Sequence, residues 1–250
     1  MLLLTEALRG AWLVERAGRW ATVGGVAGTG FDAYVRLLHP VDAHRTDTDT
    51  TDEFGGPSTS STPDGITDDE QARVWPDGWR VDQSDDEWFD PEDLEVLTDH
   101  LRVATRTPDD LVVGVWEGTG NPPWAENGGD RRARARMRTH WPGRDRWLFS
   151  ANVNELADST WAQRTVPGWE SSRHSQDGPC TSLIWPEDHA WVVASEEDWD
   201  STIVAGSRGL IDSVLADGYF EAFEVHEADD LSWDGDLLNP RRPPGRPEVR

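Results

Sequence analysis

The longest continuous block with a clear pattern of hydrophobic and polar positions lies in the C-terminal third of the chain, between Leu183 and Val225. Both faces of segment 190–195 are apolar, which is typical of a central strand covered on both sides. Segment 202–205 is a second short strand, rich in β-branched residues. The acidic run 196–200 between them is too charged for burial, so the pair predicts a hairpin with a solvated acidic turn.

A helix and a further strand are predicted after Gly206. Ser207 is a good N-cap, and one apolar stripe follows it at helical spacing. Gly218 stands where a left-handed C-terminal cap would be. Segment 220–225 returns as a strand, so the order β-β-α-β predicts a right-handed crossover within one sheet.

The N-terminal two thirds predict more strands and one well-capped helix. Segments 20–26, 31–38, 111–116 and 146–153 have strand patterns. Asp90 caps a helix with Pro91 at its first position, and its apolar stripe ends before Pro108. His39 closes the strand 31–38 and is expected to make a structural hydrogen bond.

These elements add up to an α+β domain, with mixed α/β as the alternative. We expect a single domain over 1–228 with about seven strands, two to three helices and mobile loops near 42–72, 120–145 and 163–181. Residues 229–250 are acidic and then rich in Pro and Arg, which predicts a disordered tail.

Several motifs together resemble a family of proteins of unassigned activity that is common in high-GC actinobacteria. The resemblance covers about half of the chain in the same order and implies no activity and no catalytic residues. The matching motifs are Tyr34-Val35-Arg36-Leu37-Leu38-His39-Pro40, Val115-Trp116-Glu117-Gly118, Pro142-Gly143-Arg144-Asp145, Leu148-Phe149-Ser150, Trp185-Pro186-Glu187-Asp188-His189-Ala190-Trp191, Asp200-Ser201-Thr202 and Gly206-Ser207 with the helix to Asp217.

Composition excludes several chemistries. All 23 basic residues are arginine, so a phosphate-binding P-loop, a protein-kinase site and a Schiff-base mechanism lack their lysine. The only cysteine, Cys180, allows no intrachain disulfide, and no cofactor is predicted. The glycines at 24–30 do not have dinucleotide-binding spacing.

Charge and hydrophobicity set expectations for location and partners. The net charge of −25 argues against nucleic acid and anionic membranes as partners. The chain shows no signal peptide and no long apolar run. We therefore expect a soluble cytoplasmic protein.

Two groups of charged residues are candidate sites. The carboxylates of Glu187, Asp188, Glu196 and Asp198 offer hard oxygen ligands for Mg²⁺ or Ca²⁺, although a solvated turn explains them as well. An arginine cluster is the one basic patch of an acidic chain, and its central members are Arg132, Arg134 and Arg136. It could bind nucleic acid, but the acidic background favours pairing with acids of this chain or of a partner.

Fifteen tryptophans are unusually many for 250 residues. Trp116, Trp147, Trp185 and Trp191 lie on or beside predicted strands and are expected in the core. The tryptophans in predicted loops either form a partner surface, stack on sugars or bases, or pin the loops onto the domain; they are Trp75, Trp79, Trp88, Trp124, Trp161 and Trp169.

The leading hypothesis is a non-enzymatic cytoplasmic protein that binds another protein, in an interaction or immunity-like role. The candidate partner-binding residues are Trp199, Glu196, Glu197, Asp198, Asp200, Arg132, Arg134 and Arg136. Two alternatives stay open. One is a metal-dependent hydrolase that uses the carboxylates of 187–200, and the other is a small-ligand or carbohydrate binder that uses loop tryptophans.

Overall fold

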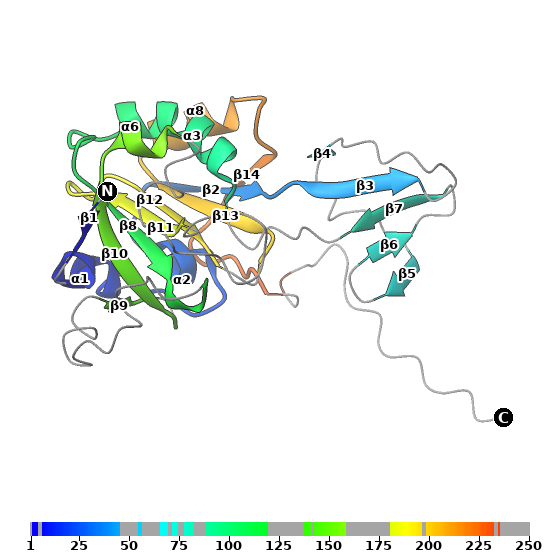
Figure 1. Cartoon of the computed structure of the whole chain (residues 1–250), viewed down its shortest axis with the longest axis horizontal. Helices are drawn as coiled ribbons and strands as arrows, with labels where there is room; N and C mark the ends of the chain where they lie inside the picture. Colours follow the sequence, from blue (N-terminus) through cyan, green and yellow to red (C-terminus); the bar gives the residue numbers. More distant parts are fainter. Residues whose placement is uncertain are drawn as a thin grey trace, which may run out of the picture.

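An antiparallel sheet of nine strands forms the centre of the structure, a computed structural model (Figure 1). The structure describes residues 2–4, 7–45, 55–56, 66–69, 72–74, 78–82, 89–119, 138–141, 143–158, 181–196, 199–232 and 235. In spatial order the strands are β1 (Leu2–Leu3), β10 (Asp145–Ala151), β8 (Leu111–Trp116), β11 (Thr181–Pro186), β12 (Val192–Ser195), β13 (Ser201–Gly206), β2 (Ala33–Leu38) and β14 (Ala222–Val225), and β9 (Arg138–His140) pairs with β10.

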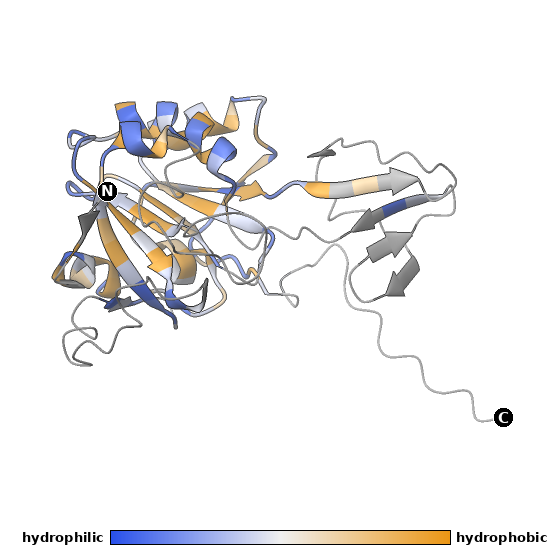
Figure 2. Ribbon diagram, viewed as in Figure 1, coloured by the Kyte–Doolittle hydropathy of each residue, from blue (hydrophilic) through white to orange (hydrophobic). Residues whose placement is uncertain are grey.

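Helices cover both faces of this sheet. One face packs against α3 (Pro91–Val103), α6 (Val153–Leu156) and α8 (Arg208–Leu215), and we call it the α3 face. The other packs against α1 (Ala11–Val14) and α2 (Val23–Ala27), and we call it the α2 face. The described residues also include two 3₁₀ helices, η1 (Ala7–Gly10) and η2 (Glu117–Thr119). Figure 2 shows hydrophobic and hydrophilic residues alternating along the helices above the sheet, and the buried residues of α3 and α8 belong to the core on this face.

A second, five-stranded sheet begins just after β2, where His39 and Pro40 lead into β3 (Figure 1). Its order is β4 (Gly55–Gly56), β3 (Val41–Arg45), β7 (Trp79–Asp82), β6 (Ala72–Val74) and β5 (Ile66–Asp69). The prediction of a loop over 42–72 is therefore wrong for the described residues in that range. Trp79, expected in a loop, is the first residue of β7.

The α+β class is confirmed, but the element count is wrong. The described residues hold fourteen strands and five α-helices, against about seven strands and two to three helices expected. The helices predicted after Asp90 and after Ser207 are both present, as Pro91–Val103 and Arg208–Leu215, and the side chains of Asp90 and Ser207 cap them. The predicted hairpin is also present as β12 and β13.

A crossover within one sheet is present, but the two strands that it joins are not neighbours. Strands β13 and β14, joined through α8, both pair antiparallel with β2 and flank it, so β2 lies between the two parallel strands. The chain leaves α8 at Ala216 in the right-handed region, and Gly218 is not among the glycines with a positive φ. The expected left-handed cap at Gly218 is therefore wrong.

Strand predictions failed at two helix starts. Segment 20–26 forms a turn and α2, in which Thr22 accepts the backbone N–H of Gly25 at 3.1 Å. The strand predicted over 146–153 ends at Ala151, because Asn152 and Glu155 form a capping box that begins α6.

Buried tryptophans tie the helices to the sheet. Trp191 and Trp141 are fully buried, and their indole N–H groups donate to the carbonyls of Leu101 at 3.1 Å and Val26 at 3.0 Å. Trp147 and Trp185 are also buried, as expected, whereas Trp116 is only half-buried. Three of the four core predictions are thus confirmed.

The glycines of α2 are required by close backbone contact. A Cβ on Gly25 would lie 2.1 Å from the carbonyl oxygen of Arg19, so the turn before α2 leaves no room for a side chain. We expect Gly25→Ala to lower the free energy of unfolding by about 2–3 kcal/mol through overpacking. Urea denaturation measures this directly.

Gly209 provides the matched control for Gly25→Ala. It lies in α8, and a Cβ there would meet nothing within 4 Å. Gly209→Ala is expected to raise stability by about 0.5–1 kcal/mol, because alanine loses less entropy in a helix. A Gly25→Ala chain that unfolds at the wild-type urea concentration would contradict the close contact.

Candidate functional site

Aromatic side chains and one arginine gather on the α2 face near the edge strand β14. We call Trp20, Arg36, Trp199, Asp200 and Phe223 the aromatic–arginine surface. Trp20 is 51% exposed and Phe223 is 50% exposed, although both are large apolar side chains. The surface therefore presents apolar area that the fold leaves in contact with solvent.

Strand register, hydrogen bonds and one ring pair link the members of this surface in a row. Phe223 lies opposite Arg36 in the β14–β2 register. The guanidinium of Arg36 donates to Asp200 Oδ1 at 3.0 Å and, through Nε, to the Ser201 hydroxyl at 2.8 Å. Trp199 precedes Asp200, and its ring centroid lies 6.1 Å from that of Trp20. The row is therefore continuous from the sheet edge to the turn before α2.

Backbone hydrogen bonds hold the turn that carries Trp199 and Asp200. The N–H of Trp199 donates to the carbonyl of Glu196 at 3.0 Å, and the N–H of His39 donates to the carbonyl of Asp200 at 2.8 Å. The His39 ring is buried and contacts the Thr202 hydroxyl at 2.8 Å, which confirms its predicted structural hydrogen bond. Trp199 and Asp200, both half-buried, thus start from fixed backbone positions.

Glu196, expected in a solvated turn, is buried with 1% of its surface exposed. Its Oε1 accepts from Arg144 Nε at 2.5 Å, and the same guanidinium lies over the ring of Trp116 at 4.6 Å. Glu196 continues the alternation of Val192 and Ala194, whose side chains pack on the α2 face. Glu196 is buried because it occupies an inward-facing position of this alternation, whatever the charge of its neighbours in the sequence.

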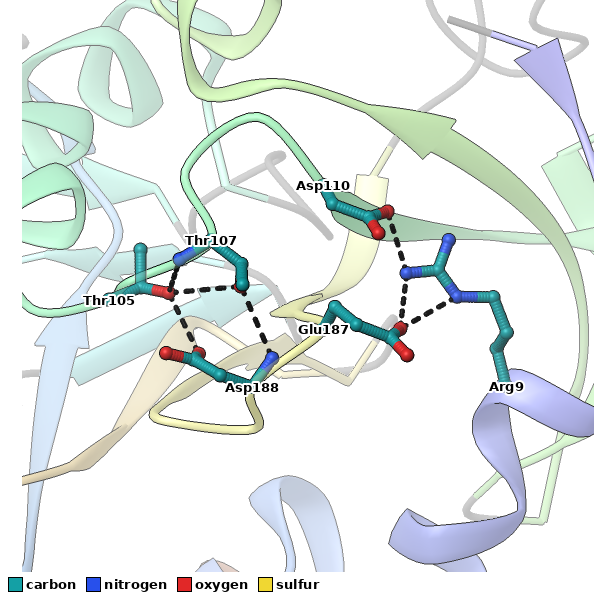
Figure 3. A network of polar contacts seen from close by, with 6 residues as sticks. All are labelled: Arg9, Thr105, Thr107, Asp110, Glu187 and Asp188. Carbon is teal, nitrogen blue, oxygen red and sulfur yellow. Dashed lines mark hydrogen bonds and ion pairs between the residues drawn. The ribbon is translucent and has the colours of Figure 1, made fainter.

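The carboxylates of Glu187 and Asp188 point to different partners (Figure 3). Glu187 accepts from Arg9 Nε at 3.0 Å, and Arg9 also donates to Asp110 at 2.8 Å. Asp188 accepts from the Thr105 hydroxyl at 2.7 Å and from the N–H of Arg106 at 2.8 Å. The network fastens η1 and the loop before β8 to the turn after β11.

The four candidate metal ligands are not brought together where they are described. Glu187 and Asp188 precede β12, whereas Glu196 follows it and pairs with Arg144. Asp198 lies outside the described residues. Among the residues that the structure describes, no group of three His, Cys, Asp or Glu side chains could hold a metal ion.

Asp188 links acid stability to this network. Burial raises the pKa of its carboxyl, but hydrogen bonds from the Arg106 N–H, the Thr105 hydroxyl and the Ala190 N–H outweigh it, so the pKa is lowered. A lowered folded-state pKa contributes stability above the unfolded value near 4, and this contribution is lost as pH falls through the folded pKa.

We expect Asp188→Asn to destabilise the chain by about 1–2 kcal/mol at pH 7, because the lost hydrogen bonds involve a charged acceptor. The gap between variant and wild type should close as pH falls from 5 to 2. Denaturant midpoints across that pH range measure it. An unchanged gap at pH 2 would show that the charge of Asp188 is not what holds the loop.

His189, next in the chain, adopts a left-handed backbone with φ of 55°. Its ring stacks on Trp12 with centroids 3.9 Å apart, and Arg16 lies over both Trp12 and Phe31. Burial is the largest cause that lowers the pKa of His189. This favours a neutral ring that packs α1 against the turn after β11. The role of His189 is therefore structural rather than catalytic.

A serine, a histidine and an aspartate meet between α3 and α8. His100 contacts the Ser213 hydroxyl at 3.0 Å through Nδ1 and Asp217 at 2.9 Å through Nε2. Ser213, however, lies inside α8 and donates its hydroxyl hydrogen to the Leu210 carbonyl at 2.7 Å. A hydroxyl engaged in that way is not activated by His100 for nucleophilic attack, so the row joins the two helices.

Other candidate residues lie outside the described residues, namely Glu197, Asp198, Arg132, Arg134 and Arg136. Of the tryptophans predicted in loops, only Trp79 is described. Sequence reasoning missed Trp20, Arg36 and Phe223. Phe223 had one usable signal, since its parity with Val225 places both on the same side of a strand.

Comparisons of this chain with protein-family models, with curated proteins and with solved structures found no match. The resemblance of its motifs to an actinobacterial family therefore stays a prediction. None of the helices in the described ranges is long and apolar enough to cross a bilayer.

Proposed function

We propose that this chain acts by binding a basic protein through the aromatic–arginine surface. One observation carries the proposal: half-exposed Trp20 and Phe223 lie in one continuous row with Trp199 and an ordered Arg36–Asp200 pair. Of the residues first expected to meet a partner, Trp199 and Asp200 remain in this proposal.

The residue types suit an interface. Tryptophan and arginine are enriched among the residues that dominate binding energy, because each combines a large apolar area with a polar group. Arg36 is held at two points, by Asp200 and by Ser201, so a partner would not have to order it. The hydrogen-bonded backbone below these side chains adds to that preorganisation.

The charge of the surroundings favours a basic partner. The chain carries a net charge of −25. Exposed carboxylates follow the surface along the chain after Phe223, at Glu224, Glu227 and Asp229. Such a field accelerates the approach of a positively charged protein and repels acidic ones.

This proposal keeps the first hypothesis of a non-enzymatic cytoplasmic protein and its immunity-like role of neutralising a basic toxin. The geometry favours it over the metal-dependent hydrolase, because Arg9 pairs with Glu187 and Thr105 with Asp188. Trp79 alone among the loop tryptophans is described, and it lies in a strand, so no observation favours the carbohydrate binder.

Affinity capture with the full chain as bait tests the proposal. We expect one basic protein to be retained from native lysate in stoichiometric amount, and to be lost when Trp20 and Phe223 are both changed to Ser. Retention of the same protein by that double variant would contradict the assigned surface. Recovery of no stoichiometric protein would contradict the function.

A further inference from the structure

We propose that the partner contributes an extended, basic segment that pairs with the edge strand β14 as an additional strand. This inference rests on the proposed function and names how the same surface is used. Among the described residues, strand β14 is the last in the order of the nine-stranded sheet and pairs only with β2. No described strand pairs with its other side, and open sheet edges of this kind accept strands from other chains.

The pairing phase shows which backbone groups of β14 point outward. The N–H of Leu38 donates to the Glu221 carbonyl at 3.0 Å, so these two form a hydrogen-bonded pair. Bonded and non-bonded pairs alternate along an antiparallel ladder. Phe223 and Val225 therefore bond to β2, and the N–H and C=O groups of Ala222 and Glu224 face away from it.

The hydrogen bonds between β2 and β13 confirm this alternation of bonded residues. The N–H of His39 donates to the Asp200 carbonyl at 2.8 Å, so Leu37 and Val35 bond to β13. Their register partners on β14 are Ala222 and Glu224. No backbone hydrogen bond within the described residues engages the outward groups of Ala222 and Glu224. Two donors and two acceptors are thus available along this edge.

Side chains on both faces of β14 fit a segment with alternating residues. Phe223 projects to the α2 face beside Arg36 and offers half of its surface to an added strand. Glu224 projects to the α3 face, where it pairs with Arg208 at 2.5 Å and stays half-exposed. An added strand would place apolar side chains near Phe223 and its alternate, basic side chains near Glu224.

Charge decides between a basic segment and a second copy of this chain. Two copies could pair their β14 strands around Phe223, with Ala222 opposite Glu224. That arrangement would bring two chains of net charge −25 together, with Glu221, Glu224 and Glu227 of each at the contact. Like charges at this density oppose association, whereas arginines or lysines at alternate positions neutralise them.

A seven-residue peptide of alternating Arg and Val, blocked at both ends, is the probe. We expect it to slow amide exchange of Ala222 and Glu224 at least tenfold in the full-length chain, with little change at Phe223, which already bonds to β2. A peptide of the same sequence with alternate residues N-methylated keeps the charge and loses strand pairing, so it should give no protection.

Ala222→Pro is the matching protein variant, with Ala222→Ser as control. Proline at the first residue of an edge strand removes an outward N–H and keeps the β2 ladder. The proline variant should bind the peptide at least tenfold more weakly than the serine variant. Because exchange is also read on the wild-type chain, the test does not depend on the folding of the proline variant.

Three results would overturn strand addition: equal binding of the N-methylated peptide, protection elsewhere than β14, or a peptide-free dimer that protects Ala222 and Glu224. Failure of the proposed function looks different. If the captured protein binds Ala222→Pro normally but not the Trp20→Ser/Phe223→Ser chain, the surface holds and strand addition is wrong. If it binds both variants normally, the surface itself is wrong.

Discussion

Replacing Arg144 with Met is expected to lower the free energy of unfolding by about 3–5 kcal/mol, the largest stability effect that we predict. Glu196 is buried with 1% exposure and accepts a hydrogen bond from Arg144 Nε. Methionine keeps much of the arginine's apolar length but leaves the carboxylate without that charge. A buried carboxylate without its counter-charge is strongly destabilising.

The control is the same substitution in a chain that carries Glu196→Gln. Removing both charges removes this ion pair altogether, so the double variant should be more stable than Arg144→Met alone by at least about 1 kcal/mol. Chemical denaturation of the four chains gives the coupling energy. Additive losses, with no recovery in the double variant, would show that the pair does not hold the turn.

The double change Trp20→Ser/Phe223→Ser is expected to weaken binding of the captured basic protein at least 100-fold, or about 2.7 kcal/mol. Truncating a single tryptophan anchor commonly costs 2 kcal/mol or more, and Phe223 adds a second apolar anchor. Both side chains are about half exposed, so their loss should leave the core intact. Isothermal titration calorimetry measures the dissociation constants.

Val103→Ser is the matched control for this effect. Val103 is 83% exposed at the end of α3, on the opposite side of the sheet. The change removes exposed apolar surface of a similar kind and should leave the dissociation constant within twofold of wild type. Thermal unfolding of all three chains separates lost binding from lost folding. Equal weakening by Val103→Ser would indicate nonspecific hydrophobic contact.

Much of the main sheet and its two longer helices could be predicted, because their signals are local. Asp90 with Pro91, and Ser207 before an apolar stripe, mark helix starts that need no tertiary information. The apolar faces of β8 and β12 likewise gave central strands. In each case the apolar positions that the local pattern marks are the ones that the fold buries.

The failures occur where distant contacts decide the structure. The N–H of Val23 donates to Asp229 at 3.0 Å and that of Gly24 to Glu227 at 2.8 Å, which satisfies the first turn of α2 from about 200 residues away. Nothing near Val23 signals this in the sequence. The strands within 41–82 pair mainly with one another, and their Thr- and Asp-rich composition resembles that of loops.

The candidate site was predictable only in part. Trp199 and Asp200 could be singled out as an anomaly in an acidic turn, and both belong to the aromatic–arginine surface. Arg36 and Phe223 joined them through pairing of β2 with β13 and β14, which a single sequence does not reveal. Glu196 was misjudged because a run of acids was treated as one environment, although side chains along a strand alternate between faces.

The most direct test of the central claim is a calorimetric titration of the captured basic protein into the wild-type and Trp20→Ser/Phe223→Ser chains, at equal salt. We predict saturable one-to-one binding by the wild type and at least 100-fold weaker binding by the double variant, with both chains folded. Equal dissociation constants for the two chains would contradict the assignment of partner binding to the aromatic–arginine surface.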